Sequence, residues 1–249
     1  MPQETTQGPL IDRKVLVTGA TSGIGRATAV AAVAAGAEVA LVSRSADEVA
    51  ALAAELGPAA HAAPGDVTDP DSVGASVALA AESMGGIDAV VCSAGAVRPG
   101  GILDTGPEDW KATFDVNVLG VLHTVGAALS HLREAAPADV VAISSMSGRR
   151  RASVAMGIYS ASKFAVHVLC DSLREELSPE GVRVTIVSPG YVRTAIFDAV
   201  ADDELRSEYQ RRLAAVGLDP AAVADQVVHA LSQPPGVDLL EIAMLSTDQ

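Results

Sequence analysis

The stretch KVLVTGATSGIG, residues 14–25, decides the fold of this chain. Its first part is a short apolar run that ends in glycine and predicts a buried strand, and the alanine-rich stretch 24–35 predicts the helix that follows. Glycines between a strand and a helix permit a tight turn and let backbone N–H groups approach a pyrophosphate at the helix N-terminus. The GxxxGxG spacing differs from the dinucleotide fingerprint GxGxxG, so a plain structural turn is the alternative.

The alternation of strand and helix continues along the rest of the chain. Strands are expected at 38–43, 59–63, 87–95, 138–145, 181–190 and 239–242, and helices at 46–56, 71–84, 107–135, 158–177 and 220–231. Continuously apolar strands that alternate with helices predict a parallel sheet covered on both faces. We therefore expect an α/β fold, a doubly wound parallel sheet of about seven strands. Residues 1–249 form a single domain in this prediction, with a flexible start at 1–11.

Composition and charge restrict the partners of the chain. Its 17 Lys and Arg residues against 31 Asp and Glu residues give a formal net charge of −14, which disfavours nucleic acid and anionic membranes. The run 149–151, three arginines, is a local exception that we interpret as a solvated loop. No segment has the length of a membrane span and the start lacks a secretory apolar region, so a soluble, cytoplasmic protein is expected.

The cysteines and histidines do not predict a metal site. Cys92 and Cys170 lie far apart in the sequence and have no metal-ligand spacing, so both are expected to be reduced core residues. The five histidines form no ligand cluster either.

The end of the second predicted strand indicates which dinucleotide is bound. An acidic side chain about 20 residues beyond the glycines would bind the ribose 2′-hydroxyl of NAD. The sequence there is LVSRS, residues 41–45, with no carboxylate. Arg44, next to Ser43, offers a planar fork suited to a 2′-phosphate, which predicts NADP(H) in preference to NAD(H). An exposed loop cation is the alternative.

Two further strand ends carry candidate cofactor contacts. Asp66 and Val67 follow the third strand and would lie beside the adenine ring, although an Asp that only forms a turn explains the same pattern. The small residues Ser93, Ala94 and Gly95 end the fourth strand and would let a ribose lie against the backbone.

A serine pair, a tyrosine and a lysine make up the candidate catalytic group. Ser144 and Ser145 end the fifth strand, and Tyr159 precedes Lys163 by four residues in the helix that follows, which places both on one face. Tyr159 would donate a proton to a carbonyl oxygen as hydride arrives at the carbon, and Ser145 would hold that oxygen. We expect the Lys163 ammonium and a nicotinamide cation to lower the pKa of the Tyr159 phenol from its usual value of about 10.

Seven motifs together resemble the short-chain dehydrogenase/reductase family, in its shorter, single-domain branch. They are TGATSGIG at 18–25, GDVTD at 65–69, CSAG at 92–95, FDVNVLG at 114–120, ISS at 143–145, YSASK at 159–163 and SPGYVRT at 188–194. Each motif is weak alone, but the set has the family's order and spacing. The resemblance implies a Rossmann-like fold and an oxidoreductase.

The resemblance also implies roles for individual residues. Asn117 matches the asparagine that helps to bind a water linking Lys163 to solvent; without the resemblance it is equally well a structural hydrogen bonder. Lys163 matches the residue that bonds the nicotinamide ribose hydroxyls, beside Tyr159. The other cofactor contacts implied are Thr18, Gly19, Ser22, Gly23, Ile24 and Gly25 in the pyrophosphate turn, Asp66 and Val67 at the adenine, Gly95 at the ribose, and Pro189, Gly190, Val192 and Thr194 at the nicotinamide carboxamide.

The chain departs from the family pattern in two places. Cys92 and Ser93 stand where the family often has two asparagines, which puts the hydrogen bonds of that strand end in doubt. The gap from Ser145 to Tyr159 is 14 residues, one more than in many relatives. Either Ser144 or Ser145 could therefore face the substrate, and we choose Ser145 because it is the last serine of the ISS pattern.

The remaining features concern substrate and assembly. The stretch 191–218 is expected to form a substrate lid, with an ordinary surface helix as the alternative. Met146, Ile158 and Tyr191 are candidate pocket walls or, equally, core residues. The helices at 107–135 and 158–177 resemble those through which relatives form dimers and tetramers, so a homotetramer is expected.

The function predicted from these observations is an NADP(H)-dependent oxidoreductase acting on a small molecule. It would interconvert a secondary alcohol and a ketone, or reduce an aldehyde. A non-catalytic dinucleotide sensor or scaffold on the same fold is the alternative, although it need not retain the Ser, Tyr, Lys and Asn set. Epimerisation or dehydration of a sugar nucleotide is a third reading, which the short region after Gly190 opposes.

Overall fold

The computed structural model describes residues 8–150, 152–200 and 202–249. The first seven residues of the segment expected to be flexible, and Arg151 of the arginine run, lie outside the described residues. Within that first segment, Leu10 is fully buried, and its backbone N–H donates to the carbonyl oxygen of Ala35 at 3.0 Å. This part of the segment therefore packs onto the domain.

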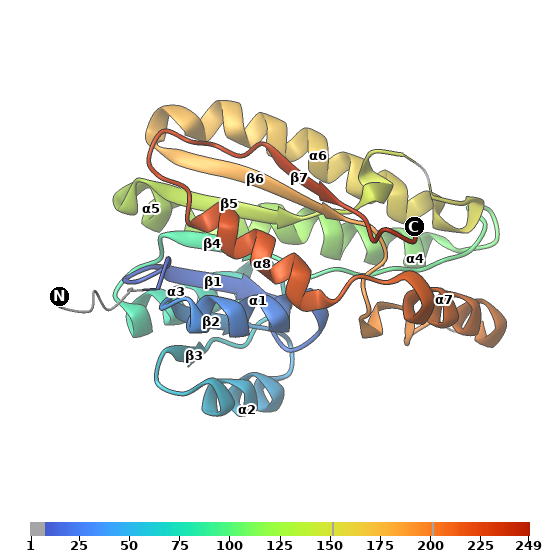
Figure 1. Ribbon diagram of the computed structural model, residues 1–249, viewed down its shortest axis with the longest axis horizontal. Helices are drawn as coiled ribbons and strands as arrows, with labels where there is room; N and C mark the ends of the chain where they lie inside the picture. Colours follow the sequence, from blue (N-terminus) through green and yellow to red (C-terminus); the bar gives the residue numbers. More distant parts are fainter. Residues whose placement is uncertain (1–7, 151, 201) are drawn as a thin grey trace.

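Seven parallel strands form one sheet, as predicted (Figure 1). They are β1 Lys14–Thr18, β2 Glu38–Val42, β3 Ala60–Ala62, β4 Ala89–Cys92, β5 Ala138–Ile143, β6 Val182–Pro189 and β7 Glu241–Met244. The strand order is β3-β2-β1-β4-β5-β6-β7, so β1 has β2 on one side and β4 on the other. The chain thus winds outward in both directions from β1, and a crevice opens at the carboxyl ends of β1 and β4. The last strand begins two residues later than predicted.

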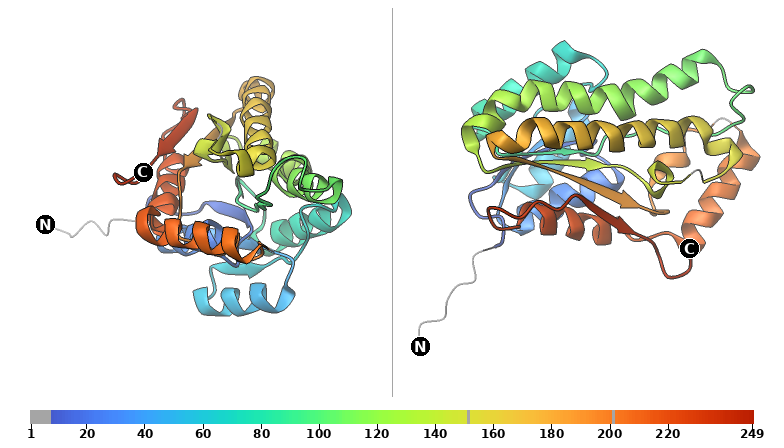
Figure 2. Two further views of the ribbon diagram at one scale, coloured as in Figure 1. Left: turned by 90° about the vertical axis from the view of Figure 1, so that its right-hand side faces the viewer. Right: turned by 90° about the horizontal axis from the view of Figure 1, so that it is seen from above.

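Helices cover both faces of the sheet (Figure 2). They are α1 Gly23–Ala34, α2 Ala46–Leu56, α3 Pro70–Met84, α4 Pro107–Phe114, α5 Gly120–Ala135, α6 Gly157–Leu177, α7 Asp203–Val216 and α8 Pro220–Leu231. Alternate residues of each strand enter opposite cores: Val15 and Val17 pack with α1, α2 and α8, whereas Leu16 packs with α3, α5 and α6. Both faces need apolar side chains, which is why the strands are rich in valine and alanine.

The helix predicted at 107–135 is interrupted. A π-helical turn, Asp115–Leu119, joins α4 to α5. By length and composition this region could span a membrane, contrary to the expectation that no segment reaches that length. Its α5 part instead packs on the sheet, where Val121, Val125 and Leu132 are buried in the core. It is therefore a core helix, and the π turn is the feature that concerns the site.

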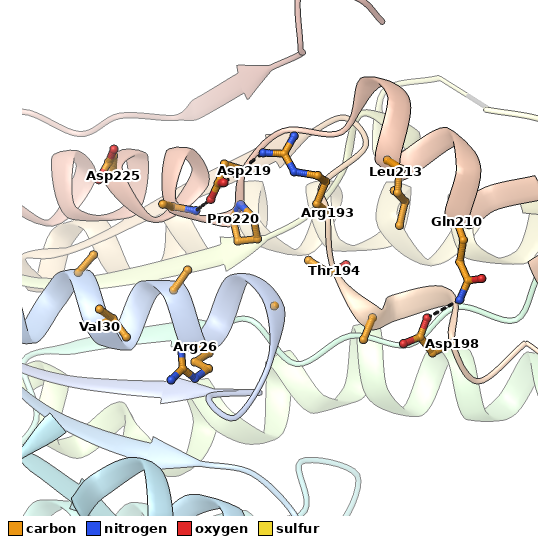
Figure 3. Close-up of a pocket in the computed structure, with 16 residues that line it drawn as sticks. Arg26, Val30, Arg193, Thr194, Asp198, Gln210, Leu213, Asp219, Pro220 and Asp225 are labelled. Carbon is orange, nitrogen blue, oxygen red and sulfur yellow. Dashed lines mark hydrogen bonds and ion pairs between the residues drawn. The ribbon is translucent and has the colours of Figure 1, made fainter. Parts of the chain in front are cut away.

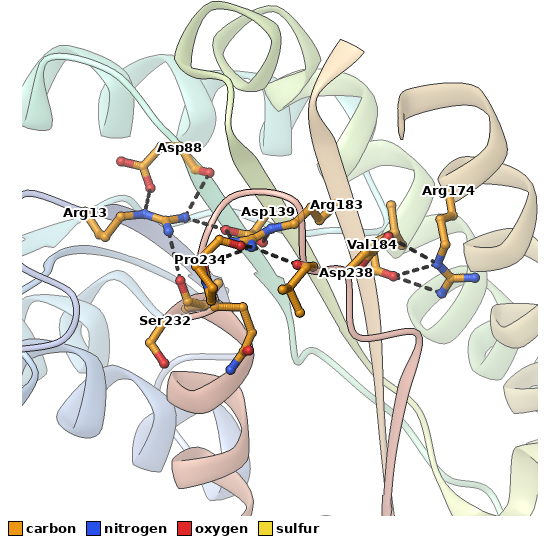
Figure 4. A network of polar contacts seen from close by, with 12 residues as sticks. Arg13, Asp88, Asp139, Arg174, Arg183, Val184, Ser232, Pro234 and Asp238 are labelled. Atoms are coloured by element: carbon orange, nitrogen blue, oxygen red, sulfur yellow. Dashed lines mark hydrogen bonds and ion pairs between the residues drawn. The ribbon is translucent and has the colours of Figure 1, made fainter. Parts of the chain in front are cut away.

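Buried ion pairs join the strands at their amino ends (Figure 4). The Asp139 carboxylate, 2% exposed, accepts from Arg13 at 2.7 Å and from two nitrogens of Arg183 at 2.8 and 2.9 Å. Arg13 also donates to Asp88 at 2.7 Å. These contacts link β4, β5 and β6 to the residue preceding β1. The opposite, carboxyl edge carries the loops and α7, which stands beyond the strand ends (Figure 1).

Candidate active site

The glycine turn after β1 has the geometry that only glycine adopts easily. Gly19 and Gly23 have φ values of +65° and +51°. A Cβ on Gly25 would lie 2.2 Å from the carbonyl oxygen of Gly19, so α1 packs closely against the turn. The Thr18 hydroxyl accepts from the backbone N–H groups of Ser93 at 3.1 Å and Ala94 at 3.2 Å. Thr18 therefore joins the end of β1 to the end of β4.

A cleft of about 810 Å³ lies at these strand ends. Nine of the predicted cofactor residues line it: Gly19, Ser22, Gly23, Ser43, Arg44, Asp66, Val67, Gly95 and Thr194. Three others, Tyr159, Gly190 and Val192, line the neighbouring cavity. The remaining predicted cofactor residues, Thr18, Ile24, Gly25, Lys163 and Pro189, line neither space.

Arg44 and Asp66 stand at the adenosine end expected of the cleft. Arg44 is exposed, and beside it the hydroxyls of Ser43 and Thr21 are 3.0 Å apart. Asp66 Oδ1 accepts from the backbone N–H of Thr68 at 2.9 Å and from its hydroxyl at 2.8 Å. Asp66 therefore does form the turn that was its alternative explanation, and it lines the cleft as well.

Tyr159 and Ser145 line a second cavity of about 870 Å³. Lys163 is buried behind them; its Nζ lies 5.7 Å from the centre of the Tyr159 ring and donates to the carbonyl oxygen of Ile143 at 2.9 Å. Ser144 is 3% exposed and does not line the cavity. Its hydroxyl oxygen lies 3.5 Å from the carbonyl oxygen of Lys163. Of the two serines, Ser145 is thus the one that shares the cavity with Tyr159.

Burial sets the pKa values of this pair in the protein alone. Desolvation raises the pKa of Tyr159 to about 12, against the opposing effect of a hydrogen bond with Ser145. Desolvation lowers the pKa of Lys163 to about 8, against the opposing effect of the buried thiols Cys170 and Cys92. In the protein alone, burial therefore raises the Tyr159 pKa more than the hydrogen bond with Ser145 lowers it, whereas the expected lowering also invoked a nicotinamide cation. Tyr159 is a neutral phenol, a proton donor, across the physiological range.

Asn117 holds backbone with its side chain. It lies in the π turn and is 1% exposed. Its Oδ1 accepts from the N–H of Ala96 at 2.8 Å, and its Nδ2 donates to the carbonyl oxygen of Ala96 at 2.9 Å and to Ser162 Oγ at 3.0 Å. Ser162 Oγ in turn donates to the carbonyl oxygen of Tyr159 at 2.7 Å. The amide thus connects the segment after β4 to the helix that carries the tyrosine.

The segment 191–218 covers the second cavity with a short helical turn, Ala195–Phe197, and with α7. The rings of Phe197 and Tyr209 stack at 4.4 Å, and the Tyr209 hydroxyl lies 3.4 Å from Ser153 Oγ. Met146 and Tyr191 line the cavity as expected, whereas Ile158 does not.

Sequence reasoning missed six polar residues of this cavity. They are Ser147, Arg150, Arg211, Arg212, Asp248 and Gln249. Gln249 Oε1 accepts from the N–H of Tyr191 at 2.8 Å, and its Nε2 donates to the carbonyl oxygen of Val216 at 2.9 Å. No spacing signal connects positions so far apart in the sequence, so only the fold identifies these residues.

A third hollow of about 780 Å³ lies between α1, α7 and α8 (Figure 3). Two pairs of its polar side chains contact each other: Arg193 with Asp219 at 3.1 Å, and Gln210 with Asp198 at 2.8 Å. Thr194 lines all three spaces and therefore forms part of the wall between them. Among the described residues, no group of three or more His, Cys, Asp or Glu side chains is placed to hold a metal ion.

Comparison with known proteins gives consistent relatives. The family model described as short chain dehydrogenase matches residues 13–205. An uncharacterized oxidoreductase of Staphylococcus aureus strain MW2 is 36% identical over 236 residues, which cover 94% of this chain and 97% of that protein.

Solved structures agree with that relationship. A short chain dehydrogenase from Burkholderia cenocepacia J2315 in complex with NADP has a TM-score of 0.83 and 31% identity, covering 95% of this chain and 97% of the other. A short chain dehydrogenase/reductase from Burkholderia phymatum in complex with NAD has a TM-score of 0.85 and 26% identity, covering 94% and 89%. Similar chains thus hold either form of the dinucleotide.

Proposed function

Because this chain belongs to the short-chain dehydrogenase/reductase family of oxidoreductases, we propose that it interconverts a secondary alcohol and a ketone, or reduces an aldehyde, with NADP(H). One observation carries the proposal: Ser145 and Tyr159 share a cavity that adjoins the dinucleotide cleft. Val97, Thr194 and Ile196 line both spaces, so a molecule in one can meet a molecule in the other.

The cleft fits a nicotinamide dinucleotide. Gly19 and Gly23, which have positive φ values, form the turn that leads into the N-terminus of α1. An anionic pyrophosphate is favoured at such a helix N-terminus. When bound, NADP(H) supplies or accepts the hydride. Arg44 lines the cleft and is suited to the 2′-phosphate, since a guanidinium can donate two parallel hydrogen bonds to a phosphate.

Ser145 and Tyr159 perform the proton chemistry in this proposal. The Ser145 hydroxyl holds the carbonyl oxygen, and the Tyr159 phenol gives its proton to that oxygen as hydride reaches the carbon. The π electrons of the C=O bond form the new O–H bond, so one carbonyl, one hydride and one proton yield one alcohol. The tyrosinate left behind is stabilised by the charged Lys163 and recovers a proton from solvent. Oxidation of the alcohol reverses each transfer.

A reductase screen tests the proton assignment. NADPH oxidation is followed over ketones, aldehydes and ketoacyl compounds with the native protein and with Tyr159→Phe. We expect kcat on any substrate found to fall about 10²–10⁴-fold in the variant, the usual value of a positioned acid. Equal turnover by the variant contradicts the proposal. If NADPH binds but no carbonyl is reduced, the sensor reading is favoured.

The cofactor preference has a separate test. We expect Arg44→Asp to lower the ratio of kcat/KM for NADPH to that for NADH by about tenfold or more, because a charge-assisted contact with phosphate is replaced by repulsion. Arg26→Asp is the matched control, since Arg26 pairs with Glu55 on α2. An unchanged ratio in Arg44→Asp removes that residue from cofactor selection.

We also propose that the protein is cytoplasmic and a homo-oligomer, a tetramer or a dimer. The apolar side chains Leu119, Phe164 and Val168 are 41%, 44% and 65% exposed beside or on α5 and α6, and a second copy of the chain would cover them. Sedimentation of the native protein and of Val168→Glu measures this, and a monomer for both contradicts it.

A further inference from the structure

We infer that the substrate carries an oxyanion, a carboxylate or a phosphate, at the end remote from its reactive carbonyl. The inference rests on the proposed function and concerns the cavity of about 870 Å³ that contains Ser145 and Tyr159. Three arginine side chains line that cavity, Arg150, Arg211 and Arg212, against one acidic side chain, Asp248.

The side chains of this cavity carry an excess of positive charge, whereas the whole chain has a net negative charge. The chain has 17 basic and 31 acidic residues, so a random set of wall residues would be acidic. The other two spaces follow that expectation. The dinucleotide cleft has Arg44 and Arg98 against Glu48, Asp66 and Asp115, and the hollow of Figure 3 has Arg26 and Arg193 against Asp198, Asp219 and Asp225. The excess of cations is thus particular to the substrate cavity among these three described spaces.

The arginines lie at the mouth of the cavity. Arg150, Arg211 and Arg212 are exposed, whereas Tyr159 is partly withdrawn from solvent. The wall also carries apolar side chains, namely Val97, Met146, Met156, Phe197, Leu213 and Leu245. A ligand that fits has a carbonyl at the tyrosine, an apolar spacer, and an anionic group at the arginines.

Two of the arginines are available for such a group. Within the part of the chain that the structure describes, no ion pair or side-chain hydrogen bond engages Arg150 or Arg211. Arg212 is partly committed: its guanidinium lies 5.5 Å from the Tyr191 ring centre and donates to the Tyr191 hydroxyl at 3.2 Å. By contrast, Arg13 and Arg183 at the other edge of the sheet are fully engaged in structural contacts. Arg150 and Arg211 are therefore the residues to test.

The test compares substrates that differ only in charge. Oxo acids with spacers of two to eight methylenes are assayed beside their methyl esters, using Arg150→Gln, Arg211→Gln and the double variant. We expect kcat/KM for the acid to fall about threefold to fivefold in each single variant and about tenfold or more in the double, while the ester values stay within twofold. Added salt should lower the acid value alone. Arg133→Gln, which removes a cation paired with Glu180 far from the cavity, should change neither.

Phosphate and carboxylate are separated by a second series. Hydroxyketone phosphates are assayed beside the oxo acids, and the class with the larger loss in the double variant is the oxyanion recognised. Binding of unreactive alkyl carboxylates and alkyl phosphates, measured by calorimetry on the complex with NADP⁺, gives a readout that does not need turnover. Weaker binding in the double variant supports the inference even if no substrate is found.

The inference and the proposed function fail separately. Equal kcat/KM for acids and esters in the native protein, or equal binding of carboxylates by the native protein and the double variant, overturns the oxyanion and leaves the reductase proposal intact. Undiminished turnover by Tyr159→Phe overturns the proton assignment and leaves the charge selectivity measurable.

Discussion

Replacing Asn117 by alanine tests whether this residue stabilises the backbone at Ala96 or takes part in proton transfer. The side chain makes three hydrogen bonds, two to the backbone of Ala96 and one to Ser162 Oγ. Alanine at this position removes all three hydrogen bonds at once. It also leaves the N–H and the carbonyl of Ala96 facing a site whose side chain was 1% exposed.

The structure gives the size of the loss. A buried polar group left without its partner costs about 1–3 kcal/mol, so the two groups of Ala96 together cost about 2–6 kcal/mol. A domain of this size shifts its melting temperature by about 2–4 °C for each kcal/mol. We therefore expect Tm to fall by about 4–24 °C. The variant should still fold, since the total stability of a domain is about 5–15 kcal/mol.

Urea unfolding followed by circular dichroism measures the loss in free energy of unfolding, and Ser162→Ala is the matched control. Ser162→Ala removes one acceptor of the Asn117 amide and one donor to the Tyr159 carbonyl oxygen, and keeps both contacts with Ala96. Its loss should be about 1 kcal/mol. NADPH binding is measured in parallel, because Ala96 lines the dinucleotide cleft. Asn117→Ala should weaken that binding more than Ser162→Ala does.

One result would refute the reasoning. If Asn117→Ala unfolds at the urea concentration of the native protein and binds NADPH as tightly, yet loses turnover, then the residue acts in the chemistry and its contacts with Ala96 are incidental. Equal losses of stability in the two variants would also contradict the ranking of the contacts.

Two other predictions follow from the buried charges. Asp139→Asn should lower the free energy of unfolding by about 3 kcal/mol, because two partly buried guanidinium groups lose the buried carboxylate that they share; a change below about 1 kcal/mol by urea unfolding would contradict this (Figure 4). The pKa of Lys163 is about 8 in the folded protein and 10.5 as its ordinary value, so the folded state binds fewer protons in that interval and stability from this group rises with pH through it. Compared with Lys163→Met, the native protein should gain about 1 kcal/mol between pH 7 and pH 9, and parallel pH profiles of the two proteins would exclude the depressed pKa.

Local residue types predict the helices best where the ends carry their own signals. The helix at 46–56 has the predicted ends, since Ser45 caps it by accepting from the N–H of Glu48, and Gly57 ends it with a positive φ. The π turn at 115–119, DVNVL, has no such signal, because none of its residues is a glycine or a proline that would mark an interruption. It is associated with the contact between Asn117 and Ala96, which joins two distant segments and is visible only in the fold.

The same distinction applies to the site. The motifs place Tyr159 and Lys163 on one helix, and the structure does so too. Their pKa values depend on how deeply the fold buries them, which spacing does not report. Burial raises the pKa of Tyr159 in the protein alone, and the lowering expected beside a nicotinamide cation stays a prediction. The choice between Ser144 and Ser145 is of the same kind: consecutive residues leave a strand on opposite sides, and only the packing of α6 shows which side meets the cavity.

Arg150 shows why a local interpretation of exposure does not say which cavity a side chain lines. Arg150 is exposed, as a solvated loop requires, but the fold brings it to the same cavity as Arg211 and Arg212. The net charge of −14 acts on a long polyanion, which must meet the whole acidic surface. A small anion inside the cavity lies within about 10 Å of the arginines in its wall, so their charges act on it. Salt largely screens the acidic residues that lie farther away. An acidic protein that repels nucleic acid can therefore still select an anionic substrate.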